Sequence, residues 1–276
     1  MVLSGTLLLP VAAGAEETAE AMGEIQVIGV TPSHGVGLPI ERIPTNVQSA
    51  TSEDLERAQA LDLSDFMNRN LGSVNINAAQ NNPLQPDVQY RGFTASPLLG
   101  LPQGLAVYQN GVRVNEAFGD TVNWDLIPKS AIDSINLIGG ANPIFGLNTL
   151  GGALSVQTKN GFTWQGTEGE VMYGSFDRLT SSIATGGNNG VLGWFAAAEF
   201  FREDGWRDHS DSDAWNAFAA LSWQNDSSTL DLIYSHGDTN LKGNGPAPAE
   251  LLAIDREAVF THPDITENLM NLIDLE

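Results

Sequence analysis

The chain has 276 residues, no cysteine, and a formal charge of −22 from 34 acidic and 12 basic residues. This length allows one or two globular domains, and the lack of cysteine excludes disulfides, thiolate metal sites and cysteine nucleophiles. The acidic balance argues against a nucleic-acid partner, because phosphate contacts need clustered lysine and arginine.

The first residues indicate export. Residues 7–12 form a short apolar run, Ala13-Gly14-Ala15 fits the small-residue pattern of a signal-peptidase site, and two glutamates follow. No lysine or arginine precedes the run, so the usual basic region is missing. We predict that residues 1–15 are a clipped signal peptide, with a disordered tail as the alternative.

Residues 16–39 have no sustained period and predict a flexible segment with one β-prone patch, whereas residues 40–161 predict a small α+β domain. Residues 51–55 begin a helical pattern that continues through Ala58 and Leu61, and residues 63–67 indicate a second helix with Ser64 as its cap. Short strands separated by Gly, Pro and Asn turns are expected at 74–76, 88–90, 105–108, 135–138 and 153–157.

Beyond Gly161 helix signals disappear until near Glu250. Strands are expected at 168–174, 178–186, 191–202, 214–224, 228–237 and 266–276. The tight turns Asn188-Asn189-Gly190 and Asn225-Asp226-Ser227 follow the second and fourth strands, while the third and fifth lead into longer loops. This alternation is typical of outer-membrane barrels, which have short periplasmic turns and longer external loops.

The faces of two strands support a membrane location. One face carries Leu192, Trp194, Ala196, Ala198 and Phe200, and the next strand carries Trp215, Ala217, Ala219, Leu221 and Trp223. An apolar stripe with tryptophan at its ends suits a lipid-facing strand, because indole rings settle at the two membrane interfaces. The alternative is a soluble β-sandwich whose alternate residues face a core.

Residues 24–161 also carry motifs that resemble, in the family's order, the plug domain of TonB-dependent receptors. The motif residues are Arg91-Gly92-Phe93, Asn110-Gly111 in a hairpin where the family usually has Asp-Gly, Trp124–Pro128, Ile132–Ile135, Phe145-Gly146, and Gly151-Gly152 opening the exit strand to Lys159. The family's Leu-Arg-Gly-Pro is absent, and Ile138–Pro143 stands in its place. The resemblance implies an α+β plug domain at residues 40–161, followed at 162–276 by the first strands of an incomplete antiparallel transmembrane β-barrel.

The number of strands indicates a piece of a longer protein. Family members have about twenty-two strands, and closed outer-membrane barrels have at least about eight. About six fit here, and an open sheet would leave unpaired backbone groups in lipid.

The resemblance implies energy-coupled uptake of a scarce ligand through the cell outer membrane, with the plug and N-terminus on the periplasmic side. The patch Glu24-Ile25-Gln26-Val27-Ile28-Gly29-Val30 would be a TonB-box-like segment that a TonB-type inner-membrane energy-coupling protein grips by strand addition. An ordinary linker is the alternative. The other expected partners are outer-membrane lipid and a small-molecule ligand.

By position in the plug, the ligand-facing loops would be residues 78–87, 94–104 and 115–124. They offer amide, apolar, charged and aromatic groups in Gln80, Asn81, Asn82, Leu98, Leu99, Glu116, Phe118 and Asp120. Such a lining suits a chelate, and a ferric siderophore or other iron chelate is the default expectation.

The residues predict no catalytic constellation, resident metal site or cofactor. His209 lies in an Asp-rich stretch, 208–213, that lacks the glycine and terminal glutamate of a calcium loop. Two other function classes stay open at this point. One is a secreted or surface binding module or adhesin with a soluble β-sandwich, and the other is a β-rich hydrolase using paired carboxylates.

Overall fold

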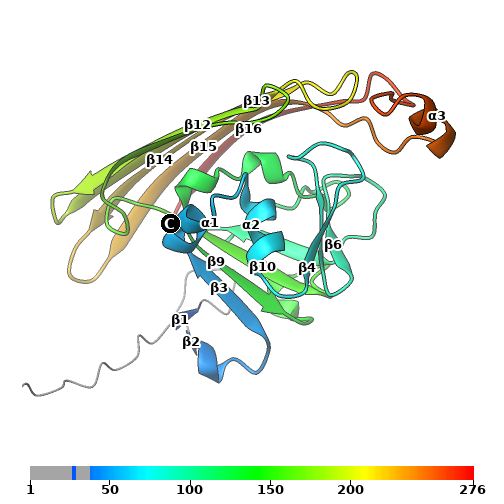
Figure 1. Cartoon of the computed structure of the whole chain (residues 1–276). Helices are drawn as coiled ribbons and strands as arrows, with labels where there is room; N and C mark the ends of the chain where they lie inside the picture. The colour runs from blue at the N-terminus through cyan, green and yellow to red at the C-terminus, as the bar shows by residue number, and fades with distance from the viewer. Residues whose placement is uncertain (1–26, 29–37) are drawn as a thin grey trace, which may run out of the picture.

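The structure is a computed structural model that describes residues 27–28 and 38–276. Within these residues an α+β domain lies against one face of a curved six-stranded sheet, β11–β16, which we call the wall sheet (Figure 1). The predicted signal peptide lies outside the described residues, as does all of the TonB-box-like patch except Val27 and Ile28.

The α+β domain contains two sheets. The larger has the order β3-β9-β10-β7-β8, in which β10 and β7 are parallel and the other neighbours are antiparallel. Its strands are β3 (Val47–Thr51), β7 (Leu105–Gln109), β8 (Val112–Arg113), β9 (Ile132–Gly139) and β10 (Gly152–Thr158). The smaller sheet comprises β4 (Val74–Asn77), β5 (Asp87–Tyr90) and β6 (Phe93–Ala95).

Short helices connect these strands. They are α1 (Ser52–Ala58) and α2 (Leu63–Asn70), with single 3-10 turns η1 (Ile40–Arg42), η2 (Trp124–Leu126), η3 (Lys129–Ala131) and η4 (Pro143–Phe145). At the entry to the domain, β1 (Val27–Ile28) pairs antiparallel with β2 (Leu38–Pro39).

Both helices differ from the sequence prediction at one end. Helix α1 ends at Ala58 because Gln59 takes a left-handed conformation (φ 47°), so Leu61 lies outside the helix. Helix α2 begins one residue after Asp62, whose carboxylate accepts a hydrogen bond from the Asp65 N–H at 2.8 Å. The prediction of Ser64 as the cap was therefore wrong, and its hydroxyl donates to Asp62 instead. Both residue types cap helices well, so local sequence could not choose between them.

The helices and both sheets enclose one apolar core. Phe66, Tyr90, Trp124 and Ile135, which come from four different elements, are each at most 1% exposed. Burial from all sides is what gives this small domain a core of its own.

The wall sheet is antiparallel throughout and follows chain order. Its strands are β11 (Gly166–Tyr173), β12 (Leu179–Asn188), β13 (Leu192–Glu203), β14 (Ser212–Gln224), β15 (Thr229–Lys242) and β16 (Ile265–Leu275). The two Asn turns lie at one end of the sheet. At the other end lie residues 204–211 and 243–264, which we call the outer loops, and which include α3 (Ala249–Ile254) (Figure 1).

The two faces of the wall sheet differ as the alternation predicted. Phe195 and Phe218, 1% and 2% exposed, point toward the α+β domain and lie with ring centroids 6.0 Å apart. Trp215 and Leu221 on the opposite face are 44% and 60% exposed. A soluble sandwich would have to leave this outer apolar stripe in water, so the fold favours the lipid-facing interpretation.

Among the described residues, none of the helices has the length and apolar character to cross a membrane.

Candidate binding site

Two of the sequence motifs are hairpin turns that shape the α+β domain. Asn110 and Gly111, with φ of 47° and 79°, form the two-residue turn between β7 and β8. Asn-Gly is the preferred pair for such a turn because both residues tolerate positive φ. Arg91 and Gly92 make the corresponding turn between β5 and β6.

The motif residues Phe93 and Gly151 meet in space although they are far apart in sequence. A Cβ added to Gly151 would lie 2.5 Å from the Cβ of Phe93, so only glycine allows this contact. At Gly152 an added Cβ would lie 2.3 Å from the Ile138 carbonyl oxygen. These motif residues therefore hold the exit strand β10 against its neighbours, which is a structural role.

The three predicted ligand loops are linked to one another through Ser96. Its hydroxyl donates to the Asp87 carboxylate, at the end of the first loop. Its carbonyl oxygen accepts from the Val122 N–H of the third loop at 2.9 Å. Ser96 is fully buried, and sequence reasoning did not single it out, because a lone serine in a loop carries no pattern.

The first loop, residues 78–87, reaches the outer loops of the wall sheet. The Asn82 side-chain nitrogen donates to the Ser212 hydroxyl at 2.9 Å and to the Lys242 carbonyl at 3.1 Å. Asn82 is 2% exposed, so it anchors the loop and is not free to contact a ligand. Asn81 accepts from the Trp206 indole N–H at 3.1 Å, and the Gln80 carbonyl accepts from Gly245 N–H at 3.3 Å.

The second and third loops share an exposed apolar tip. Leu99 and Phe118 are 59% and 80% exposed, and a Cβ on Gly119 would lie 2.4 Å from Leu99 Cδ2. Leu98 is half-buried, and its N–H donates to Ser96 at 3.0 Å. The pair Leu99 and Phe118 is thus the most accessible part of the predicted ligand surface.

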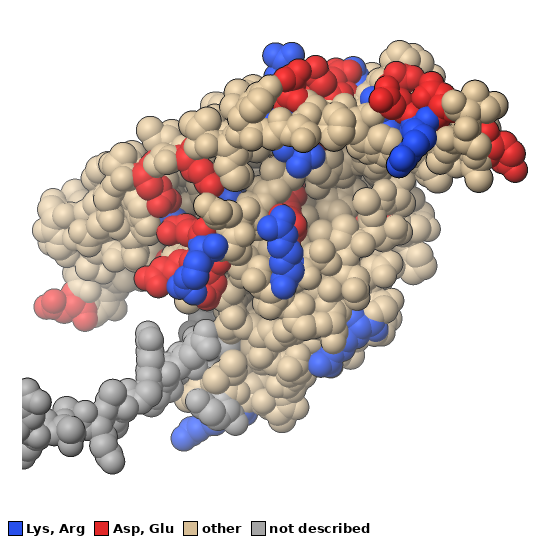
Figure 2. Space-filling model, in the orientation of Figure 1, with Lys and Arg blue, Asp and Glu red and all other residues tan. Residues whose placement is uncertain are grey.

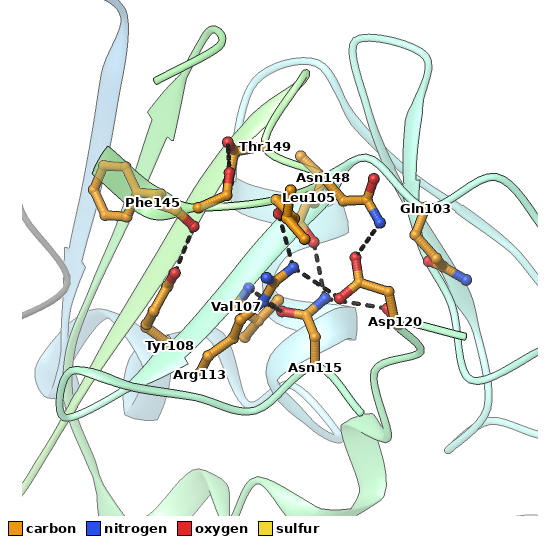
Figure 3. Close-up of polar contacts among 12 residues, drawn as sticks. Gln103, Leu105, Val107, Tyr108, Arg113, Asn115, Asp120, Phe145, Asn148 and Thr149 are labelled. Carbon is orange, nitrogen blue, oxygen red and sulfur yellow. Dashed lines mark hydrogen bonds and ion pairs between the residues drawn. The ribbon is translucent and has the colours of Figure 1, made fainter. Parts of the chain in front are cut away.

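Asp120 organises the third loop (Figure 3). The Arg113 guanidinium donates to one of its carboxylate oxygens at 2.7 Å and the Asn148 amide to the other at 2.6 Å. Asn115 donates to the Asp120 carbonyl at 3.2 Å. With its carboxylate already engaged twice, Asp120 serves to hold the loop. The exposed Glu116 carboxylate accepts from the Asn123 amide at 3.2 Å. Sequence analysis missed Arg113, Asn115 and Asn148.

The outer loops bind each other. Arg207 donates from its two terminal nitrogens to the carbonyls of Gly245 and Ala258. The rings of His209 and His262 stack with centroids 3.7 Å apart and planes 3° from parallel. Acidic side chains gather over this end of the wall sheet (Figure 2). The loops therefore form an acidic, internally bonded rim beside residues 78–87.

Polar contacts attach the α+β domain to the wall sheet. The Lys159 ammonium, 2% exposed, lies 3.2 Å from Glu56 of α1 and 3.4 Å from Glu168 of β11. Lys129 donates to the Ala60 carbonyl at 2.7 Å and lies 3.7 Å from Glu170. Sequence reasoning missed these contacts, because most of the pairs, such as Lys159 with Glu56 and Lys129 with Ala60, join segments far apart in the chain.

Two cavities lie along this interface, of about 60 and 210 Å³. Neither is lined by any of the eight predicted ligand contacts. Burial raises the pKa of Asp62, which lines the smaller cavity, to about 6, and it also raises the pKa of Asp125 on the same cavity.

Comparisons with known proteins agree with the arrangement. A family model described as the TonB-dependent receptor plug domain matches residues 39–153. The vitamin B12 transporter BtuB of Vibrio cholerae is 28% identical over 142 residues, which is 51% of this chain and 22% of that protein.

Solved structures show the same fold. The ferripyoverdine receptor of Pseudomonas aeruginosa aligns with a TM-score of 0.59 at 18% identity, over 79% of this chain and 28% of that one. The ferric-catecholate import receptor Fiu of Escherichia coli K12 aligns with a TM-score of 0.61 at 13% identity, over 80% of this chain and 30% of that one. The chain thus spans between about a fifth and a third of the length of these relatives.

Proposed function

We propose that this chain is part of a TonB-dependent receptor, a member of an outer-membrane family of receptors and transporters and not of enzymes, and that the complete receptor imports a small ligand across the outer membrane in an energy-coupled manner. The α+β domain is its plug domain, and the wall sheet is the first part of its barrel. The observation that carries the proposal is the plug's seat on the inner face of the wall sheet, with its first loop bound to the outer loops.

We propose that ligand binds at the tip formed by Leu99 and Phe118, and that Gln80 and Asn81 of the first loop provide further contacts. An aromatic ring and an aliphatic side chain supply apolar contact, and amide groups supply hydrogen bonds, which is the usual composition of a small-ligand site. The ligand class is a metal chelate. A ferric siderophore is the first candidate, because the two compared structures are named as a ferric-catecholate import receptor and a ferripyoverdine receptor. Cobalamin is the second, because the sequence relative is a vitamin B12 transporter.

Energy coupling would act through residues 24–30, the TonB-box-like patch. Its Val27 and Ile28 pair with Leu38 and Pro39 at the start of the plug, so a pull on the patch would be applied directly to the plug's entry. An extended segment of this kind can be gripped through its main chain by a partner strand. A TonB-type inner-membrane protein is the proposed partner.

The ligand surface is tested in the complete receptor with a panel of ferric siderophores and cobalamin as probes. Replacing Leu99 and Phe118 together by alanine should weaken binding of the cognate probe at least about tenfold, equivalent to about 1.4 kcal/mol. Leu150→Ala, which removes a comparably exposed plug side chain outside the three loops, is the control. Equal affinity in both variants would place the ligand elsewhere.

Coupling is tested by deletion. Removing residues 24–30 should abolish uptake and leave probe binding unchanged, whereas removing residues 16–22, a segment of equal length, should preserve both. Undiminished uptake without residues 24–30 would refute the coupling role.

A further inference from the structure

One plug residue, Asp125, is bound by three consecutive strands of the wall sheet through its carboxylate and its backbone carbonyl. Asp125, in η2, is 5% exposed. Its Oδ2 accepts from Thr239 Oγ1 of β15 at 2.7 Å and from Asn268 Nδ2 of β16 at 2.9 Å. Its backbone oxygen accepts from Asn216 Nδ2 of β14 at 2.9 Å.

The wall sheet has a recess that fits η2. Gly237 of β15 lies opposite Asn216 of β14 in the sheet register. A Cβ on Gly237 would come within 2.6 Å of Leu126 Cδ2 and 2.8 Å of Asn216 Oδ1. The glycine thus leaves room for Leu126, the neighbour of Asp125, to pack directly on the strand, so the contact combines hydrogen bonds with close packing.

Only one of the two carboxylate oxygens of Asp125, Oδ2, accepts hydrogen bonds from the described residues. Oδ1 of Asp125 and Oδ1 of Asn216 are both buried and accept no hydrogen bond from the described residues, and both side chains line the smaller interface cavity. That cavity, of about 60 Å³, has room for a few water molecules. Water in this cavity can therefore compete for the hydrogen bonds that attach Asp125 to the wall sheet. A buried polar group with only some of its hydrogen bonds made costs free energy.

Asp125 also follows directly on the third predicted ligand loop. Residues 115–124 end at Trp124, which is 1% exposed and fixed in the plug core. No residue lies between Trp124 and Asp125, so a displacement of Trp124 would displace Asp125 as well. On the other side, β14, β15 and β16 run into the outer loops.

We propose that Asp125 is a positioning residue that holds the third ligand loop to wall strands β14–β16, and that this Asp125 anchor must open when the plug moves. The inference rests on the proposed function for its role in uptake. The attachment itself can be measured without a ligand and without transport.

The experiment compares plug-side and wall-side variants of the complete receptor. Asp125→Ala removes the carboxylate acceptor, and the double variant Thr239→Val with Asn268→Ala removes both donors to that carboxylate while leaving every plug residue intact. Hydrogen exchange is followed at the amides of Leu126 and Ile127, whose hydrogen bonds lie within η2 and at its end. Each variant should speed exchange about tenfold or more, because η2 then opens locally.

Combining the variants distinguishes an anchor from general destabilisation. The triple variant should exchange no faster than the more affected of the two parents, because both remove the same interaction. Asp125→Asn retains an acceptor oxygen and should keep exchange near that of the unmodified receptor. Asp87→Asn is the control, since Asp87 is an equally buried plug carboxylate whose partners, Asn77 and Ser96, both lie within the plug.

A second readout follows plug movement. Entry of vancomycin, which is too large for passive passage through an intact receptor, should rise in cells carrying the wall-side double variant. Unchanged exchange in both parents, or effects that add in the triple variant, would overturn the anchor. If exchange responds as expected but no ligand is imported, the anchor stands and the proposed transport function fails.

Discussion

The plug domain and the wall sheet bury their apolar side chains in different ways. In the plug, helices and two sheets surround the core, and Phe66 and Trp124 are each 1% exposed. In the wall sheet, neighbouring residues of one strand alternate between extremes, as Phe195 at 1% and Trp194 at 45% show. The plug therefore carries its own core, whereas the wall strands need the plug on one face and lipid on the other.

The boundary between the two regions is polar. Lys159 with its two glutamates and Asp125 with its three wall strands are both almost completely buried. Hydrogen bonds and ion pairs of this kind fix one position of the plug on the wall sheet. Replacing them by hydrogen bonds to water costs less free energy than exposing an apolar core to water. This difference suits the proposed function, in which the plug stays seated at rest and moves during uptake.

The largest effect is expected when a charged residue is introduced on the outer face of the wall sheet, which the comparison assigns to lipid. Ala219 lies on that face between Trp215 and Trp223, so Ala219→Arg would place a cation at mid-membrane and cost about 2–4 kcal/mol of folding free energy in lipid bilayers. Asp226→Arg, in the exposed turn beyond the tryptophans, should cost much less. Equal stability of the two variants in bilayer unfolding experiments would contradict a lipid-facing sheet.

A somewhat smaller effect is expected at the plug–wall boundary. Replacing Glu56 and Glu168 together by glutamine leaves the buried Lys159 with two weaker attractions, that of Asp133 and that of the Trp164 ring, whose centroid lies 5.1 Å from the ammonium. Removing the charged partners of the buried Lys159 should lower the free energy of unfolding by about 2 kcal/mol. The loss is smaller than for a fully buried ion pair, because both glutamates are half-exposed. Denaturant titration of the complete receptor measures this loss.

The control for this pair is Glu53→Gln, which removes an exposed glutamate 3.9 Å from Arg57 and should change stability by less than about 0.5 kcal/mol. A similar small loss in the double variant would mean that Lys159 does not stabilise the junction.

The last effect is a pH dependence inside the plug, which is small at each pH step. Burial raises the pKa of Asp62 from 3.8 to about 6, so its contribution to stability is present below pH 4 and is lost as the pH rises toward 6. The loss is at most about 1.4 kcal/mol per pH unit. Asp62→Asn keeps a good helix cap and should remove this slope, so the stability difference in its favour grows between pH 4 and 6. A constant difference across that range would show that Asp62 is not the titrating group.

Local patterns in the sequence determined the strands and their faces. Alternation assigned Trp215 and Leu221 to the outer face, and Asn110-Gly111 specified a hairpin turn, because both depend only on residues a few positions apart. The motif order identified the plug in the same way. The coupling role of residues 24–30 and the ligand contacts stay predictions.

Only the tertiary structure decided which polar residues meet. Asp125 and Asn268 are separated by 143 positions and Asn82 and Ser212 by 130, so neither partner changes any local pattern around the other. It also showed Asn82 and Asp120 to be loop anchors, although in sequence they are as suitable for ligand contact as exposed Phe118. A side chain's type and spacing follow from the chain itself, but its burial and its hydrogen-bond partners depend on which distant strand the fold brings beside it.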